Sequence, residues 1–110
     1  MLIAVAGPYT ADTEIQKKKN LDAMNEAAAR VYEKGHIPLI GVNAALYVIE
    51  KLEGESEKNA MMDISLALVE RCDALLLIGE SPGANRERDL ILSKGKIVYN
   101  SIYEIPDLKK

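Results

Sequence analysis

The sequence predicts an α/β fold, a three-layer Rossmann- or flavodoxin-like domain with a four-stranded parallel sheet in the order 2-1-3-4. Two observations support this. Short apolar segments alternate along the chain with longer segments of helical periodicity. The most apolar segments, 2–6 and 74–78, do not alternate between polar and apolar residues, which indicates parallel strands that are buried on both faces.

The first half of the chain predicts a strand, a long helix, a second strand and a short helix. Residues 2–6 form the first strand, and Thr13 and Gln16 match a capping box at the start of the helix. Gly35 is a typical residue to end it. Pro38 suits an edge strand, where a missing backbone donor costs little. The other two elements are a strand at 37–40 and a helix at 44–52.

The second half repeats the alternation of helix and strand. A polar connection at 53–57 precedes an amphipathic helix at 58–71. The fully apolar run at 74–78 is the strongest strand signal and is expected at the centre of the sheet. A helix at 84–94 and a strand at 97–99 follow, and the rest is expected to be a polar tail.

Composition excludes several classes of protein. The chain has 110 residues, 48% of them hydrophobic, which suits one domain spanning 1–110. Its net charge of −3 offers no basic surface for a nucleic-acid polymer. One cysteine, Cys72, and one histidine, His36, leave no basis for a disulfide or a structural zinc site, and the apolar start is too short for a membrane segment. We therefore expect a cytoplasmic domain with no cofactor and no membrane partner.

Two loops are expected to form the ligand site, because ligands of such sheets bind beyond the carboxyl ends of the strands. These loops are 7–12, after the first strand, and 79–87, after the third. Neither contains the glycine-rich fingerprint of a dinucleotide site, and the second lacks the lysine of a P-loop. Dinucleotide and ATP binding are therefore disfavoured, as is a phosphorelay receiver, which would need an acceptor aspartate after the third strand.

The second loop contains residues suited to an anion and to a reactive carboxylate. Ser81 and Gly83 lie at a predicted helix N-terminus, where unpaired N–H groups favour negative charge. Glu87 follows one turn later, next to the buried face of the helix. Arg86 and Arg88 would favour its ionised form, as a nucleophile requires. The structural alternative is a glutamate that merely stabilises the first helical turn or forms a salt bridge.

Four motifs occur in an order that resembles the nucleoside 2-deoxyribosyltransferase superfamily. They lie at 6–10, 35–38, 72–77 and 81–87. The chain is most similar to short uncharacterised members and more distantly to 2′-deoxynucleoside 5′-monophosphate N-glycosidases. The resemblance implies a deoxyribosyltransferase-like domain, a nucleoside or nucleotide as the small-molecule partner, and a homodimer or larger homo-oligomer.

The resemblance also implies roles for particular residues. Glu87 corresponds to the catalytic glutamate, whose carboxylate attacks C1′ of the deoxyribose and displaces the base. Tyr9 falls near the residue that helps to position this carboxylate, although it could simply pack over the end of the sheet. Ser81 and Gly83 match the loop that binds the 5′-phosphate. The further residues expected to bind substrate are Gly7, Pro8, Thr10, Asn43 and Ala84.

A second acid is expected to protonate the departing base, and Asp63 is the candidate. The position at the spacing of the superfamily is Ser65, two residues away, and Asp63 could equally belong to a solvent-exposed stripe. Arg88 and Asp89 stand where the enzymes have small residues. The function expected is cleavage or transfer at the N-glycosidic bond of 2′-deoxynucleosides or their 5′-monophosphates. The alternative is a catalytically silent nucleotide-binding module of the same fold.

Other residues have more ordinary interpretations. Asn43 could line the site, although a helix N-cap is favoured for it. His36 is expected to cap a loop or lie at the surface rather than act as a general base. Cys72 is expected in the core.

Overall fold

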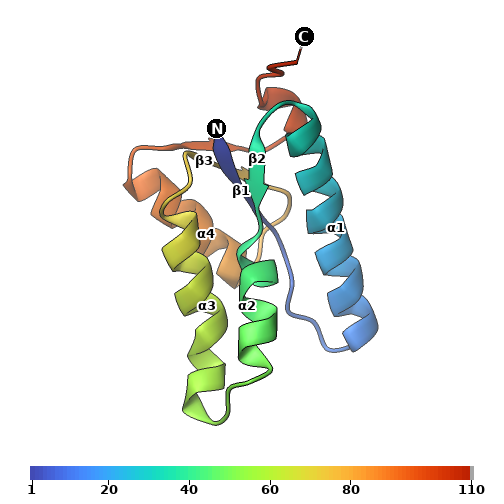
Figure 1. Cartoon of the computed structure of the whole chain (residues 1–110), viewed down its shortest axis with the longest axis vertical. Helices are drawn as coiled ribbons and strands as arrows, with labels where there is room; N and C mark the ends of the chain where they lie inside the picture. Colours follow the sequence, from blue (N-terminus) through green and yellow to red (C-terminus); the bar gives the residue numbers. More distant parts are fainter. Residues whose placement is uncertain (110) are drawn as a thin grey trace.

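A computed structural model describes residues 1–109, with Lys58 described by its backbone alone. Within these residues the strands form one parallel sheet in the order β2-β1-β3-β4, which confirms the predicted topology (Figure 1). The strands are β1 (Leu2–Ala6), β2 (Ile37–Leu39), β3 (Ala74–Leu77) and β4 (Ile97–Tyr99). The helices are α1 (Glu14–Glu33), α2 (Gly41–Ile49), α3 (Glu55–Val69), α4 (Pro82–Ser93) and the 3-10 helix η1 (Ile102–Glu104).

The two central strands are buried on both faces, as their sequences predict. Every residue of β3 is buried, and so are four of the five residues of β1. Ala4 pairs with Leu75 of β3 on one side and with Leu39 of β2 on the other. Pro38 lies in β2, an edge strand, where a residue without a backbone N–H is tolerated.

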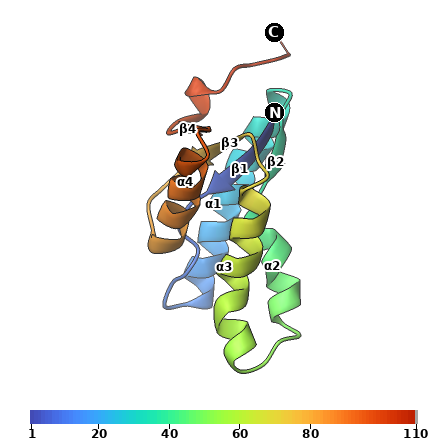
Figure 2. The same ribbon diagram turned by 90° about the vertical axis from the view of Figure 1, so that its left-hand side faces the viewer.

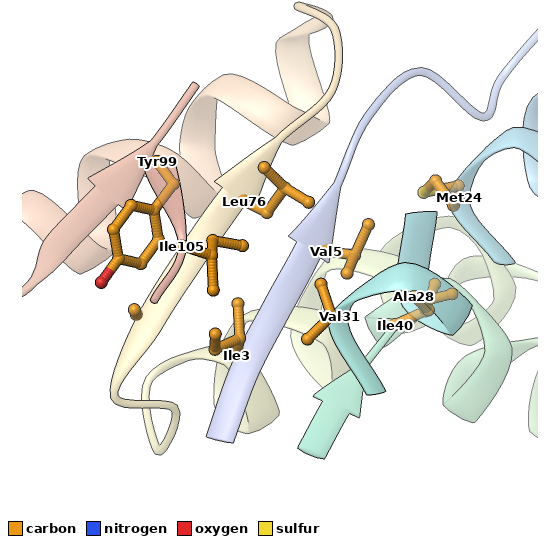
Figure 3. Packing of buried hydrophobic residues seen from close by; sticks show 10 residues of the cluster. Ile3, Val5, Met24, Ala28, Val31, Ile40, Leu76, Tyr99 and Ile105 are labelled. Carbon is orange, nitrogen blue, oxygen red and sulfur yellow. The ribbon is translucent and has the colours of Figure 1, made fainter. Parts of the chain in front are cut away.

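Alternate residues of the central strands face two separate cores. Ile3 and Val5 point to α1 and pack with Val31, as Figure 3 shows. Ala4 and Ala6 point to the opposite face and pack with residues of α3 and α4. The sheet is therefore covered by α1 and η1 on one side and by α3 and α4 on the other.

The helices α2 and α3 lie side by side and extend beyond the carboxyl ends of the strands (Figures 1 and 2). Residues of both helices line a cavity there, together with residues of the two predicted ligand loops.

Three of the predicted helices begin two or three residues earlier than expected. The helix α2 begins at Gly41, so Asn43 lies in its first turn and is not the N-cap that we favoured. The helix α3 begins at Glu55 instead of residue 58, and α4 begins at Pro82 instead of residue 84. Proline is well suited to the first helical position, because its missing N–H would be unpaired there anyway.

The predicted N-cap Thr13 and the predicted end of α1 at Gly35 are confirmed, but the capping box predicted from Thr13 and Gln16 is not formed. The hydroxyl of Thr13 accepts a hydrogen bond from the backbone N–H of Gln16 at 3.1 Å. The Gln16 side chain binds Asn20 instead of completing the capping box. Gly35 follows the helix with φ +96°, a conformation that favours glycine.

The predicted polar tail is part of the fold. Ser101 and Glu104 form a capping box around η1, and Ile105 is 2% exposed in the α1-side core. The ammonium group of Lys34 donates to the carbonyl oxygens of Ile102 and Ile105 at 2.8 Å each. These contacts fix the segment against the end of α1.

The expectation that His36 lies at the surface is wrong, whereas its contact with a loop carbonyl agrees with the expected capping role. His36 is 1% exposed and its Nε2 lies 2.7 Å from the carbonyl oxygen of Pro106. Its Nδ1 lies 3.1 Å from the amino group of Met1. The ring is buried because the C-terminal segment folds over it, which a local sequence pattern does not reveal.

Within residues 1–109 no helix is long and apolar enough to cross a membrane.

Candidate functional site

A cavity of about 560 Å³ lies at the carboxyl end of the sheet. Its walls come from β1 and the loop after it, the middle of α1, the start of α2, the middle of α3 and the first turns of α4 with the residue before it. The lining residues are Val5, Gly7, Tyr9, Thr10, Met24, Gly41, Val42, Met61, Met62, Ser65, Ser81, Pro82, Gly83, Ala84, Arg86 and Glu87. This is the location expected for a ligand site in a parallel sheet.

The carboxylate of the cavity is Glu87, which is 7% exposed. It lies on the buried side of α4 because Ala84 and Ile91, three residues before and four after it, also face inward. The hydroxyl of Ser65 donates a hydrogen bond to Oε1 of Glu87. A buried ionisable group in a cavity is a typical feature of a functional site.

The expectation that Arg88 favours the ionised form of Glu87 is wrong. Burial raises the pKa of Glu87 above its ordinary value of 4.5, and the hydrogen bond from Ser65 opposes this by lowering it. Arg88 does not reach the carboxylate, because its guanidinium binds Glu80 at 3.2 Å and Asp89 at 3.0 Å near the surface. The ionised form is therefore supported by a neutral hydroxyl, not by Arg88.

Ser65 reaches Glu87 from α3, on the opposite wall. It is 1% exposed and lies four residues after Met61 and four before Val69, so the three share one side of the helix. Asp63 is exposed, because residues two apart on a helix point in nearly opposite directions. The structure thus brings Ser65, and not the predicted acid Asp63, to the carboxylate.

The start of α2 closes the cavity behind Ser65. A β-carbon built on Gly41 would lie 2.8 Å from Cβ and 3.0 Å from Cα of Ser65, so only glycine fits there. Val42, the next residue, lines the cavity together with Met61 and Met62 of α3. These side chains give the α2–α3 wall an apolar surface.

The loop after β1 forms another wall. The amide of Asn20 donates to the carbonyl oxygen of Tyr9 at 3.0 Å, which ties the loop to α1. The Tyr9 side chain is partly buried against the α1-side core and lines the cavity. The hydroxyl that contacts Glu87 within the described residues belongs to Ser65, not to Tyr9.

The N-terminus of α4 supplies the polar end of the cavity. The hydroxyl of Ser81 accepts a hydrogen bond from the N–H of Ala84 at 3.1 Å and so caps the helix. Gly83 faces Met62, whose sulfur would lie 3.4 Å from a β-carbon at that position. Arg86 is exposed and lines the cavity from the next turn. The dipole of α4 and the guanidinium of Arg86 together favour an anion at this end of the cavity.

The cavity brings together seven of the ten residues predicted for the site: Gly7, Tyr9, Thr10, Ser81, Gly83, Ala84 and Glu87. The other three lie outside its lining. Pro8 packs beside Gly79 where the two loops meet. Asn43 is exposed, and its amide donates to Oδ1 of Asn25 at 3.0 Å. Asp63 is exposed on α3.

Several lining residues had no predicted role in the site, above all Gly41, Met61 and Met62, and Ser65 was passed over in favour of Asp63. The spacing of the superfamily already indicated Ser65, and its place on the apolar side of α3 is a second signal, since a serine on a buried stripe needs a hydrogen-bond partner. Gly41 had no comparable signal. In the described part of the chain, no group of three or more His, Cys, Asp or Glu side chains could hold a metal ion.

The fold and the cavity define an α/β domain with a buried carboxylate at the carboxyl end of a parallel sheet. The chain belongs to the family described as a domain of unknown function, DUF4406, whose match spans residues 1–100. No match is found among curated proteins.

Proposed function

We propose that the protein cleaves or transfers at the N-glycosidic bond of 2′-deoxynucleosides or their 5′-monophosphates, with Glu87 as the nucleophile. The observation that carries the proposal is the Glu87 carboxylate, buried in a cavity at the carboxyl end of the sheet and hydrogen-bonded through one oxygen. The resemblance of the motifs around it to the nucleoside 2-deoxyribosyltransferase superfamily supports the same chemistry.

The proposed reaction proceeds through a covalent intermediate. A carboxylate oxygen of Glu87 attacks C1′, the C1′–N bond breaks, and the base leaves with the electron pair and takes up a proton from water. Water or a second base then attacks C1′ and releases the carboxylate, as in retaining glycosidases. Splitting one difficult displacement into two steps lowers the barrier to each.

The polarity of the cavity suits such a substrate. The helix terminus at Ser81 and the guanidinium of Arg86 would hold the 5′-phosphate or the hydroxymethyl group. The apolar wall of Val42, Met61 and Met62 would contact the base. Glu87 lines the same cavity, as an attack on the sugar between these two groups requires.

The test is chromatographic detection of free base. The protein is incubated with a panel of deoxynucleosides and their 5′-monophosphates, with and without an acceptor base. We expect base release or exchange by the parent and none by Glu87→Gln. The matched control is Asp63→Asn, which removes an exposed carboxylate outside the cavity and is expected to retain activity. Base release that persists in Glu87→Gln would exclude this glutamate as the nucleophile.

One observation favours a second candidate, a catalytically silent nucleotide-binding module. Among the residues that the structure describes, Glu87 is the one carboxylate that lines the cavity, so no second acid stands ready to protonate the departing base. In this case the parent would release no base from any substrate. It would bind nucleotides saturably, and the binding would survive Glu87→Gln.

The proposed setting is the cytoplasm, whose reducing conditions suit the free, buried thiol of Cys72.

The resemblance supports assembly into a homodimer or a larger homo-oligomer. Light scattering on the purified protein would test the assembly separately from catalysis.

A further inference from the structure

The hydroxyl of Ser65 is buried and committed to a single acceptor. A serine in a helix often donates to the carbonyl four residues earlier, but a hydroxyl has only one proton to give. Here that proton goes across to Oε1 of Glu87 on α4. With 1% of its surface exposed, Ser65 is poorly placed to attack a substrate itself. Its role is therefore to act on Glu87.

Gly41 restricts where this hydroxyl can lie. Of all atoms near a β-carbon built on Gly41, Oγ of Ser65 is the nearest, followed by Cβ at 2.8 Å. The first residue of α2 thus packs directly against the Ser65 side chain and restricts its rotation. Ser65 of α3 therefore contacts α2 at Gly41 and α4 at Glu87.

The other carboxylate oxygen of Glu87 remains accessible. Among the described residues no buried side-chain oxygen lacks a hydrogen-bond partner, and Ser65 holds Oε1. No group of the described residues donates a hydrogen bond to Oε2, so Oε2 must retain some exposed surface, and we infer that it faces the cavity that Glu87 lines. The two oxygens therefore differ: one is anchored and the other is open to a ligand.

We propose that Ser65 is the positioning residue of Glu87, holding Oε1 through its hydroxyl so that Oε2 is presented to the cavity as the attacking atom. The catalytic meaning of this inference rests on the proposed function. The contact itself can be measured in the protein without any substrate.

The surroundings of Glu87 offer no substitute for this hydroxyl. The pKa of Glu87 is raised by burial and lowered by the Ser65 hydrogen bond, with no contribution from a cation. The other titratable groups of the cavity lining are Arg86 of α4 and Tyr9 of the loop after β1. Outside the lining, the charge of Glu87 contributes to raising the pKa of the Cys72 thiol. Lining residues from α2 and α3 carry no charge. Loss of the hydroxyl should therefore raise the pKa of Glu87 further.

The experiment follows the Glu87 carboxyl by NMR over a pH titration of protein labelled with ¹³C-glutamate, the signal being assigned from its loss in Glu87→Gln. The variants are Ser65→Ala, which removes the hydroxyl, and Ser65→Cys, which keeps a side chain of similar shape with a weaker donor. Ser56→Ala, an exposed serine on the same helix, is the matched control. The pH profile of kcat/KM is recorded for the same set.

We expect Ser65→Ala to raise the pKa of Glu87 and to move the acid limb of the kcat/KM profile to higher pH. We also expect kcat/KM at neutral pH to fall at least about tenfold, since hydrogen bonds to charged groups contribute that much. Ser65→Cys should shift in the same direction and Ser56→Ala should match the parent. Should Ser65→Ala fail to fold, Ser65→Cys carries the comparison.

An unchanged Glu87 titration in a folded Ser65 variant would overturn the inference, and so would a shifted titration with an unmoved acid limb in an active enzyme. A parent without turnover, whose Glu87 titration still shifts in Ser65→Ala, would support the anchoring contact while rejecting the proposed function. The two failures are therefore distinguishable.

Discussion

Gly41 and Ser65 pack against each other where α2 meets α3, with no space for a β-carbon between them. The same serine donates to Glu87 on α4, so the contact links the shape of the α2–α3 pair to the position of the cavity carboxylate. The geometry of the candidate site consequently depends on helix packing as well as on the two loops at the ends of the strands.

The first prediction concerns this contact. Gly41→Ala places a methyl group 3.0 Å from the backbone of Ser65, so we expect a loss of roughly 1–3 kcal/mol in the free energy of unfolding. Gly83→Ala is the control, because its methyl group would meet only the flexible Met62 side chain, at 3.4 Å. Helix propensity alone would make either change neutral or stabilising. Urea unfolding measures both, and a fully stable Gly41→Ala would show that α2 can move away.

The second prediction concerns the burial of Glu87. The pKa of Glu87 in the folded state is raised above its ordinary value of 4.5. Between pH 4.5 and that raised pKa, Glu87 is therefore protonated more in the folded protein than in the unfolded chain. Stability therefore falls as pH rises through this window, and above it the cost of burying the charge is fully present. Glu87→Gln removes that cost. We expect its Tm to exceed that of the parent at neutral pH, with the difference closing below pH 4.5.

Thermal unfolding over a range of pH tests this prediction against Glu80→Gln. Glu80 is an exposed partner of Arg88, and its loss should change stability little at any pH. A Glu87→Gln variant that is less stable than the parent at neutral pH would mean that the buried charge contributes net stability.

The third prediction concerns the thiol of Cys72. Burial raises its pKa from 9.0 to about 11, so the thiolate at mildly alkaline pH should be about 100-fold scarcer than for an ordinary cysteine. Ellman's reagent should therefore react very slowly with the folded protein and rapidly in urea. Similar rates in the two conditions would show that the thiol is accessible in the folded state.

The fourth prediction concerns the C-terminal segment. Ile105 is 2% exposed in the core, whereas Tyr103, two residues away, is 90% exposed. We expect Ile105→Ala to lower the free energy of unfolding by about 2–4 kcal/mol and Tyr103→Ala to change it by less than about 0.5 kcal/mol. Equal effects in urea unfolding would contradict the packing of this segment against the sheet.

The sheet was predictable because its signals are local. A strand buried on both faces is a continuous apolar run, as at 2–6 and 74–78, and alternation with helices then implies parallel pairing. The two site loops followed from the same topology, and Glu87 followed from its position one turn into a helix. These inferences need no knowledge of how distant segments pack.

The remainder depended on tertiary packing. Ser65 is a site residue only because α3 lies across from α4, and Gly41 only because α2 lies on Ser65. Arg88 is near Glu87 in sequence, yet its guanidinium binds acidic partners near the surface. His36 is buried by a segment some seventy residues further along the chain, at Pro106. Local patterns do not encode such contacts.

The most direct test of the proposed chemistry is a search for a sugar covalently bound to Glu87. The protein is mixed with a deoxynucleoside 5′-monophosphate, quenched in acid, digested and analysed by mass spectrometry. We predict that deoxyribose 5-phosphate is attached through C1′ as an ester to the Glu87 carboxylate, and that free base accompanies it. We expect neither product with Glu87→Gln. Free base without any adduct, released equally by the parent and by Glu87→Gln, would contradict the account.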